Sequence, residues 1–445
     1  MVKKSKKVTI IVTLVLLTAV IAYFVLNIFF SPYWDSVYPA PGYFSLASMR
    51  SADSDSETFS HEKACADIDY IIGRLGRVHP ECIKSVPENV LECAEREKSS
   101  FGDAVTTYEL WRSAARVLHE MGDANCIAAP SFSMNYLTDY SKMLDKGCSL
   151  AAVNGESVDD IFSRNSDIIS YDIGAEAWGK SVVQGFAGTR EGLKFLGIDE
   201  SELVFTYKYP NGSVKDKTYS SSDFYNYQAA KNDSETADQP YYSDIFADKN
   251  AAVMTLDSCV YSMEYKEFVY KFFTDTAESG AENVIIDLRS NSGGTSEVLD
   301  EIMMYLDKKS FRTPGGDWRL GHYMMHWDSE ETKIINMDVE TLFSGDIYVL
   351  TSSDTFGSAT LMAEILADNG FAKLAGEPCG NMPDGYGDVA VFQTPNAAIT
   401  FEIPTKHFER IDKSKSGQPL SPDIECNAAD ALDRVLDVIS NNKNK

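Results

Sequence analysis

The sequence predicts an α/β protein in which a βαβ core sheet follows a helical subdomain and one membrane-spanning helix. Three observations lead to this prediction. An uncharged apolar run, Val8 to Phe30, follows a cluster of four lysines at the N-terminus. Apolar residues recur at helical spacing over residues 61–129. Over the C-terminal part of the chain, short buried strands alternate with helical stretches, as expected for βαβ units.

The N-terminal segment is predicted to anchor the chain in a membrane. Its apolar run covers about 23 residues, enough to cross the hydrocarbon core of a bilayer with some tilt. Clustered lysines before it favour a cytoplasmic N-terminus and an extracytoplasmic remainder. A cleaved signal peptide is the alternative, but the run is long and no A-x-A site follows it cleanly. Residues 1–30 are therefore predicted to be a cytoplasmic tip and a signal-anchor of a single-pass cell-membrane protein.

The composition is that of a globular protein with an acidic surface. The 445 residues are 44% hydrophobic and 24% charged, which suffices for two or three domains. A formal net charge of −27 repels phosphate backbones, so nucleic acid is not an expected partner. All eight cysteines lie beyond the predicted anchor, where disulfides or free buried thiols are both open. Their spacing matches no zinc site.

The predicted segments follow in order. Residues 31–60 contain Pro and Tyr and then a polar stretch, and are predicted to be a tether. Residues 61–140 form the helical subdomain, and residues 141–225 mix short strands with loops. Residues 226–249 are polar and acidic, which indicates a linker. The core is predicted over residues 250–440, with buried strands at Val253–Leu256, Val284–Leu288 and Ile347–Leu350.

Two segments of the core have features of a ligand-binding turn. Residues 283–294 read NVIIDLRSNSGG, a buried strand that ends in a charged turn and two glycines. Such glycines let the backbone approach a ligand closely. Residues 347–370 read IYVLTSSDTFGSATLMAEILADNG, a strand, a polar turn and a helix that begins near Ser358 and stops at Gly370. Taken alone, these segments are more simply a glycine turn and an N-cap serine.

Together the two segments resemble the C-terminal-processing (tail-specific) serine peptidases. That family carries a strand ending D-L-R-x-N-x-G-G and then a strand–turn–helix that bears the catalytic serine, closed by D-N and a G-E-P-like strand. The chain has both in this order. Weaker matches are the helix ending His79-Pro80, GDANC at 122–126, AVNGES at 152–157 and PDI at 422–424. The resemblance covers residues 61–440. It implies a ClpP/crotonase-like core, a degenerate PDZ-like insert over 141–225, and serine-type peptide hydrolysis without cofactor or metal.

The resemblance places non-catalytic residues at the family's catalytic positions. An alignment without gaps puts Gly357 at the serine position and Met382 at the general base of the lysine-using branch. Asn125 replaces the histidine of the other branch. Glycine has no side chain to attack with, and neither Asn nor Met accepts a proton near neutral pH. Ser358 is then a displaced nucleophile candidate, offset by about 100° around a helix. The candidate bases are His119, Lys373 and Lys406.

The implied oxyanion hole uses backbone groups that survive these substitutions. Its donors would be the N–H of Ser358 and that of Gly293 or Gly294. Two functions are therefore open. The chain is either a membrane-anchored serine peptidase acting on peptides or protein C-termini, or an inactive peptide-binding or scaffold protein on the same fold. His322 and His326 lie four residues apart, but no third ligand accompanies them, so no metal is expected.

Overall fold

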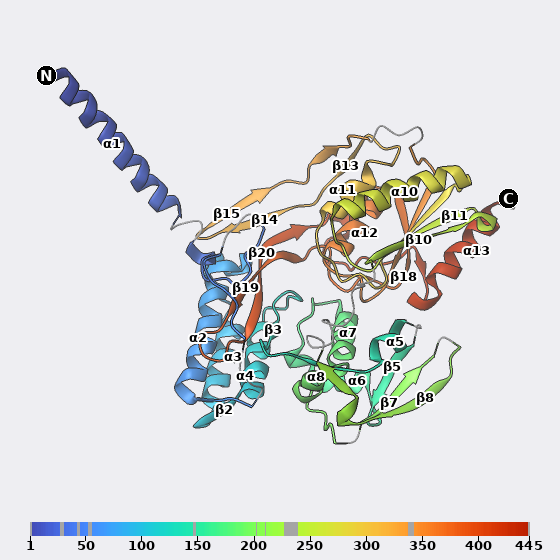
Figure 1. The fold of residues 1–445 in the computed structure, drawn as a ribbon, viewed down its shortest axis with the longest axis horizontal. Helices are drawn as coiled ribbons and strands as arrows, with labels where there is room; N and C mark the ends of the chain where they lie inside the picture. Colours follow the sequence, from blue (N-terminus) through green and yellow to red (C-terminus); the bar gives the residue numbers. More distant parts are fainter. Residues whose placement is uncertain are drawn as a thin grey trace.

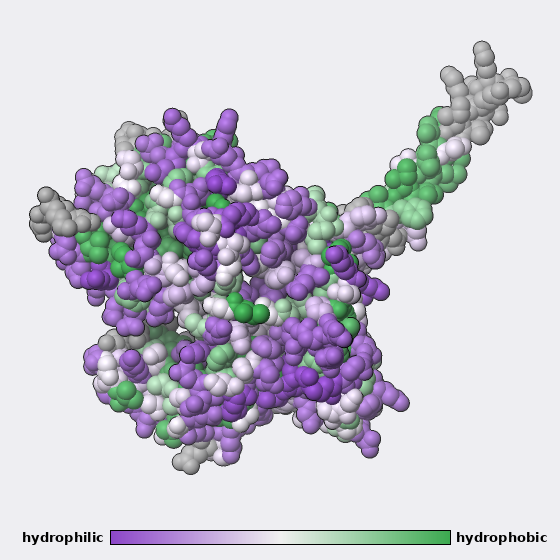
Figure 2. All heavy atoms as spheres, turned by 180° about the vertical axis from the view of Figure 1, so that it is seen from behind, coloured by the Kyte–Doolittle hydropathy of each residue, from purple (hydrophilic) through white to green (hydrophobic). Residues whose placement is uncertain are grey.

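The computed structural model describes residues 2–26, 31–41, 45–51, 56–145, 148–201, 203–209, 211–226, 239–336 and 342–443. Figure 1 shows a lobe built on the core sheet beside a second part that contains the N-terminal helices and the insert. A long ribbon of strands joins the two. Hydrophilic residues cover most of the face that Figure 2 shows, as the strongly charged composition predicts.

Helix α1 (Val2–Val25) extends away from the rest of the chain (Figure 1) and exposes apolar side chains from Ile11 onward, which Figure 2 shows in green. Within the described ranges, no helix combines the length and the hydropathy that a membrane crossing requires. The transmembrane segment predicted over residues 8–30 is therefore not found there, and its last four residues, 27–30, lie outside the described part of the chain.

Part of the predicted tether, residues 31–60, packs on the folded part of the chain. The short helix η2 (Ser31–Tyr33) buries Tyr33, whose hydroxyl donates to Arg319 O at 2.7 Å. Tyr38 forms a β-bridge with Val391. Residues 31–40 therefore do not form a simple tether, because the Tyr33 side chain is buried and Tyr38 pairs through its backbone with a residue more than 250 positions away. Residues 42–44 and 52–55 lie outside the described ranges.

Three helices form the N-terminal subdomain where helical spacing predicted them: α2 (His61–Val78), α3 (Glu88–Ser100) and α4 (Thr107–His119). Ser60 caps α2, and Thr106 with Glu109 forms a capping box at the start of α4. Short strands β1 (Thr58–Ser60) and β2 (Ala104–Thr106) pair beside them. The apolar faces of the helices meet in one core.

The insert contains a four-stranded antiparallel sheet in the order β6-β5-β7-β8. Its strands are β5 (Ser149–Val153), β6 (Glu156–Ser157), β7 (Leu203–Lys208) and β8 (Val214–Tyr219). The tight turn predicted after β5 is present, with positive φ at both Asn154 and Gly155. The other elements are α5 (Tyr140–Asp145), α6 (Val158–Asn165), α7 (Glu176–Ala187), α8 (Arg190–Phe195), β4 (Asn135–Leu137) and β9 (Phe224–Asn226).

The core sheet has six strands in the order β10-β11-β12-β17-β18-β21. They are β10 (Tyr241–Phe246), β11 (Ala251–Leu256), β12 (Asn283–Asp287), β17 (Asp346–Thr351), β18 (Ala372–Gly376) and β21 (Ile424–Glu425). All neighbouring pairs are parallel except β10 with β11. The buried strands predicted in this region are confirmed. The linker predicted over residues 226–249 instead contributes edge strand β10, while residues 227–238 lie outside the described part.

Helices cover both faces of this sheet. One face packs on α10 (Met263–Ser279), α11 (Glu297–Met303) and α12 (Ser358–Asp368), and the other on α13 (Ala431–Lys443) (Figure 1). Alternate strand residues belong to the two clusters, for example Val284 to the first and Ile285 to the second. Strands buried on both faces read as continuous apolar runs, which is the pattern that the sequence has.

A second sheet, which the sequence did not predict, joins the core to the helical subdomain. Its strand order is β15-β14-β20-β19, and β3 (Ala128–Ala129) pairs with β20. The strands are β14 (Gly315–Leu320), β15 (Tyr323–Trp327), β19 (Tyr386–Gln393) and β20 (Thr400–Glu409). Two short strands, β13 (Ser310–Arg312) and β16 (Glu331–Lys333), pair nearby. Buried Arg319 donates to the carbonyls of Gly76 and His79 and so ties this sheet to the end of α2.

Helix α12 carries a buried carboxyl group on its core face. Glu364 is 1% exposed, and its Oε1 accepts the N–H of Ile411 at 2.9 Å. The buried ion pair between Asp368 and Arg410, 3.0 Å long, lies one turn further along the helix. Burial, and to a lesser degree the charge of Asp368, raises the pKa of Glu364 to about 8.

The raised pKa of Glu364 predicts that stability falls as the pH rises from about 4.5 to about 8. In this window the unfolded chain has released the proton that the folded chain still binds, so ionisation favours unfolding. Glu364→Gln keeps an oxygen acceptor for Ile411 and removes the titration. We expect the variant to exceed the unmodified protein by about 4 kcal/mol at pH 8 and to match it near pH 4, as measured by urea unfolding. Exposed Glu278→Gln is the control, and equal pH slopes for Glu364→Gln and the unmodified protein would contradict the assignment.

Candidate functional site

The double-glycine bend and the start of α12 are in direct contact. Strands β12 and β17 are parallel neighbours, so the turns that follow them lie at the same edge of the sheet. The N–H of Phe356 donates to Asn291 O at 3.0 Å. A Cβ added at Gly293 would lie 3.0 Å from Phe356 O and 3.2 Å from Ser358 N. The two segments singled out in the sequence therefore lie against each other, as predicted, and we call the surface where they meet the crevice.

Glycine is required at both positions of the bend. The φ angles are 103° at Gly293 and 138° at Gly294, and a Cβ at Gly294 would lie 2.2 Å from Cys259 O. Buried Asn291 fixes the bend, because its Oδ1 accepts the N–H of Gly293 and its Nδ2 donates to Leu256 O, both at 2.9 Å. The N–H of Gly293 is thus occupied. That of Gly294 has no acceptor among the described residues.

Gly357 occupies a turn shaped for a nucleophile but has no side chain. Its φ of 58° and ψ of −121° are a conformation that costs a residue with a side chain about 1–3 kcal/mol. Sharp, strained turns from strand to helix are how other hydrolases expose a catalytic serine. The Gly357 N–H donates to Asn381 Oδ1 at 2.8 Å. A Cβ here would meet nothing closer than Ser292 O, at 3.8 Å, so the space for a side chain is present.

Ser358 is the first residue of α12, and its hydroxyl faces the glycine bend. The hydroxyl donates to Gly294 O at 2.8 Å. Within the described ranges no imidazole, amine or carboxylate bonds to this hydroxyl, and the Ser358 N–H has no acceptor. Ser358 therefore lies beside the predicted oxyanion donors, and its hydroxyl is bonded to a backbone carbonyl rather than to a base of the described part of the chain.

The fold connects the segments that carry Asn125 and Met382 through the insert. Asn125 donates to Tyr386 O at 2.9 Å. The carboxylate of Asp172 accepts the N–H groups of Ala124 and Met382, both at 2.8 Å, and so links the residues beside Asn125 to the loop of Met382. Burial, and then the charge of Asp123, raises the pKa of Asp172 to about 6.

Sequence reasoning missed the residues that hold this arrangement. Asp172 lies in the insert, in a stretch without any motif, so nothing in the sequence pointed to it. Asn381, which accepts the N–H of Gly357, lies next to Met382 but in no recognisable pattern. The role of Asn291 could have been predicted, because it is the asparagine of the D-L-R-x-N-x-G-G segment.

None of the candidate bases contacts Ser358. His119 donates its Nδ1–H to Ile169 O at 2.8 Å and packs beside Tyr171. Lys406 lies 2.5 Å from Asp388 and above the ring of Trp318. Lys373 is exposed near the start of β18, at the end of that strand away from the crevice. The structure therefore brings together Gly357, Ser358, Gly293 and Gly294. Asn125 is bonded to Asp123 and Tyr386 instead. Of the three candidate bases, Lys406 lines the same groove as Ser358, but its ammonium group is paired with Asp388.

Two groups of side chains have ligand atoms close enough for a metal. Asp317, His326 and Glu409 lie on the second sheet, where His326 is exposed; His322 is not part of this group. His79, Asp123 and Cys126 are buried together beside Asn125. There, His79 Nδ1 accepts the N–H of Glu81, so Nε2 carries the ring proton and donates it to Asp123 at 3.3 Å. This pair positions the turn at 122–126 rather than offering a free lone pair.

A groove of about 310 Å³ opens beside Ser358. Helices α11 and α12 form one wall, and residues of β13, β15 and β20 form the other. Its lining is mainly apolar and aromatic: Leu299, Phe311, Trp327, Leu361, Met362, Ile365 and Phe408. The groove is at the lower end of the size range of ligand pockets.

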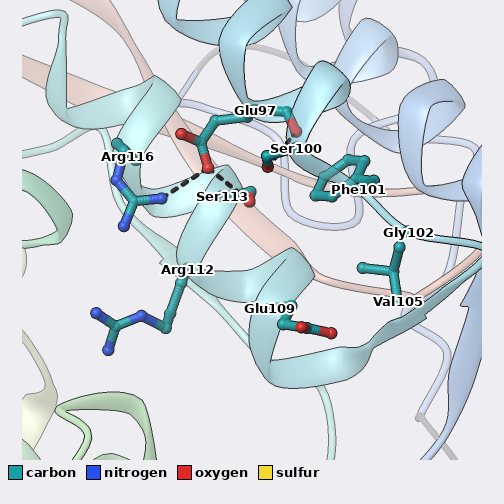
Figure 3. Close-up of a pocket in the computed structure, with 9 residues that line it drawn as sticks. All are labelled: Glu97, Ser100, Phe101, Gly102, Val105, Glu109, Arg112, Ser113 and Arg116. Atoms are coloured by element: carbon teal, nitrogen blue, oxygen red, sulfur yellow. Dashed lines mark hydrogen bonds and ion pairs between the residues drawn. The ribbon is translucent and has the colours of Figure 1, made fainter.

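A smaller cavity of about 210 Å³ lies between α3 and α4 (Figure 3). Its lining is polar, and the groups pair with one another. The carboxylate of Glu97 accepts from Ser113 at 2.8 Å and from Arg116 at 2.6 Å. The cavity contains none of the residues that the sequence singled out.

Comparison with known proteins gives two results. Residues 250–426 match the sequence profile of Peptidase family S41. The chain is also similar in structure to mature CPAF (TM-score 0.58, 13% identity, 85% of this chain and 97% of that one). It is also similar to mature CPAF complexed with lactacystin (TM-score 0.59, 13% identity, 86% and 99%). At this identity the likeness is one of fold.

The photosystem II D1 C-terminal processing protease aligns over 85% of this chain and 97% of its own length, at 11% identity and a TM-score of 0.45. The profile match covers the core sheet except its edge strand β10, and it includes the glycine bend and α12, which build the crevice. The core of this chain, residues 250–426, therefore belongs to peptidase family S41, the tail-specific serine peptidases.

Proposed function

We propose that this protein binds extended peptide segments or protein C-termini in the crevice between the glycine bend and α12, without cleaving them. The observation that carries the proposal is the residue at the nucleophile turn. Gly357 keeps the strained backbone but has no side chain, and the neighbouring Ser358 hydroxyl is bonded to Gly294 O. Serine-type hydrolysis needs a hydroxyl whose proton an adjacent base accepts.

Two backbone donors support peptide binding in this crevice. The N–H groups of Ser358 and Gly294 have no acceptor among the described residues. They lie at the N-terminus of α12, where the helix dipole favours a carboxylate or a polarised carbonyl. The apolar groove begins at Ser358 and offers space for a side chain of the bound peptide. Backbone donors do not depend on which side chains the catalytic positions carry.

A weakly active peptidase is the second candidate, because Ser358 lines the groove in which a peptide would lie. Its hydroxyl would have to leave Gly294 O and find a base when substrate binds.

Two further features stay predictions. The PDZ-like character of the insert rests on AVNGES at 152–157 and on the antiparallel sheet around it. Localisation in a cell membrane rests only on the N-terminal lysines and the apolar run after them.

We expect no labelling of the protein by a fluorophosphonate probe, because no base among the residues that the structure describes is bonded to Ser358. In-gel fluorescence measures the label, and an active serine hydrolase of similar size serves as positive control. If the unmodified protein is labelled and Ser358→Ala abolishes the label, the peptidase candidate replaces the binding proposal.

We expect Ser358→Pro to weaken peptide binding by about 10- to 100-fold, the value of one hydrogen bond to a charged group. Proline removes the N–H and is well tolerated at the first position of a helix. Ser358→Ala keeps the N–H, so it should bind as the unmodified protein does. Fluorescence anisotropy of a labelled peptide with a free C-terminus measures affinity, and circular dichroism checks the fold. Equal affinity of the two variants would remove the backbone donor from the proposal.

We expect Gly357→Ser combined with Asn125→His to gain fluorophosphonate labelling. The space at Gly357 accepts a Cβ, and a histidine at 125 would lie beside Asp123, which could orient it. Each single variant is the control and should stay unlabelled. A folded double variant that takes no label would show that these positions do not correspond to the family's serine and histidine.

A further inference from the structure

The apolar groove beside Ser358 has one carboxylate at its edge that lacks a counter-charge. Asp300 lies in the first turn of α11 and lines the groove. No lysine, arginine or histidine of the described residues lies within ion-pair distance of it. Partial desolvation, and then the charge of Glu297 three residues earlier on the helix, raises its pKa. Two like charges at this spacing repel each other, and a cation between them and the groove would relieve the repulsion.

The other charged group of the groove is already neutralised. The Nζ atom of Lys406 lies 2.5 Å from Asp388 and over the rings of Trp318 and Trp327. Its ammonium group therefore acts as part of the aromatic wall. The uncompensated charge that a ligand meets in the groove is that of Asp300.

The net charge of the whole protein also favours the binding of basic ligands. The formal net charge is −27, from 67 acidic and 40 basic residues. A field of this sign raises the local concentration of cationic ligands and speeds their association, and salt weakens the effect. A strongly acidic peptide is disfavoured both at long range and at the groove.

We propose that the groove selects peptides in which a bulky apolar residue is followed, two positions later, by a lysine or arginine. In an extended peptide, residues i and i+2 point to the same side, about 7 Å apart. The apolar side chain then lies against Leu361, Met362 and Phe408, and the basic group lies beside Asp300. The inference rests on the proposed function, since it assumes that the crevice binds an extended peptide.

The test is a matched set of labelled six-residue alanine peptides whose affinities are measured by fluorescence anisotropy. The parent has phenylalanine with arginine two positions later. In three relatives glutamine replaces the arginine, glutamate replaces the arginine, or serine replaces the phenylalanine. We expect the parent to bind about two- to fivefold tighter than the glutamine peptide, the range of a partly exposed ion pair, and the other two to bind more weakly still.

Asp300→Asn should reduce the preference for arginine over glutamine to about one. Asp346→Asn makes the same change in net charge at the opposite end of β17, so it is the control and should keep the preference. If the control loses the preference as fully as Asp300→Asn, the effect comes from net charge and the role of Asp300 is overturned. If the serine peptide binds as tightly as the parent, the apolar groove is not the site.

The experiment distinguishes failure of peptide binding from failure of the proposed selectivity. If none of the four peptides binds, the proposed function fails, and the inference that rests on it fails too. If all four bind with equal affinity, peptide binding stands and the selectivity assigned to the groove is overturned. A preference that disappears in high salt and in Asp300→Asn but persists in Asp346→Asn supports the inference.

Discussion

The crevice depends on the parallel pairing of β12 with β17, because this pairing brings the turns after the two strands into contact. Each strand ends at the same edge of the sheet, and each continues into a turn, one carrying two glycines and the other leading into α12. The turns can touch only because Gly293 and Gly294 lack Cβ atoms that would collide with backbone atoms of Phe356 and Cys259. Asn291 then locks the bend through two hydrogen bonds. Every donor of the proposed site follows from this contact.

Gly357 holds a strained turn before α12 and has no side chain. Backbone strain persists where surrounding packing enforces it, and here Asn381 holds the N–H of Gly357 while α12 packs into the core behind it. Glycine adopts the same φ and ψ at little energetic expense. A turn of this shape therefore survives loss of the side chain, and so do the N–H groups that point into the crevice. Peptide binding as proposed uses these N–H groups, whereas cleavage would also need a nucleophile and a base.

The core, the insert and the helical subdomain contact one another through specific side chains and are not independent domains. Asp172 of the insert bridges the turn after α4 and the loop of Met382, and Trp178 of α7 stacks on Phe356 at the crevice. Arg319 of the second sheet bonds to carbonyls at the end of α2. A ligand that displaces the turn before α12 would therefore also displace Trp178 of the insert, because its ring stacks on Phe356. The site belongs to the whole assembly of core, insert and helical subdomain.

The sequence by itself determined the features that depend on neighbouring residues. Continuous apolar runs predicted β11, β12 and β17, and the glycine at 370 predicted the end of α12, because periodicity and φ preference act over a few positions. The order of the two motifs also predicted that Gly293 would face Ser358.

Only the tertiary structure decided which partner each polar group meets. The bond of Asp172 to Met382 spans 210 positions, and that of Ser358 to Gly294 spans 64. Burial of the segment after α1 and formation of the second sheet likewise need distant partners. Sequence patterns carry no record of such pairings, since the free energy that selects them arises when distant surfaces meet and exclude water. The atom that accepts the Ser358 hydroxyl proton was therefore not predictable from sequence, and it decides what the crevice can do.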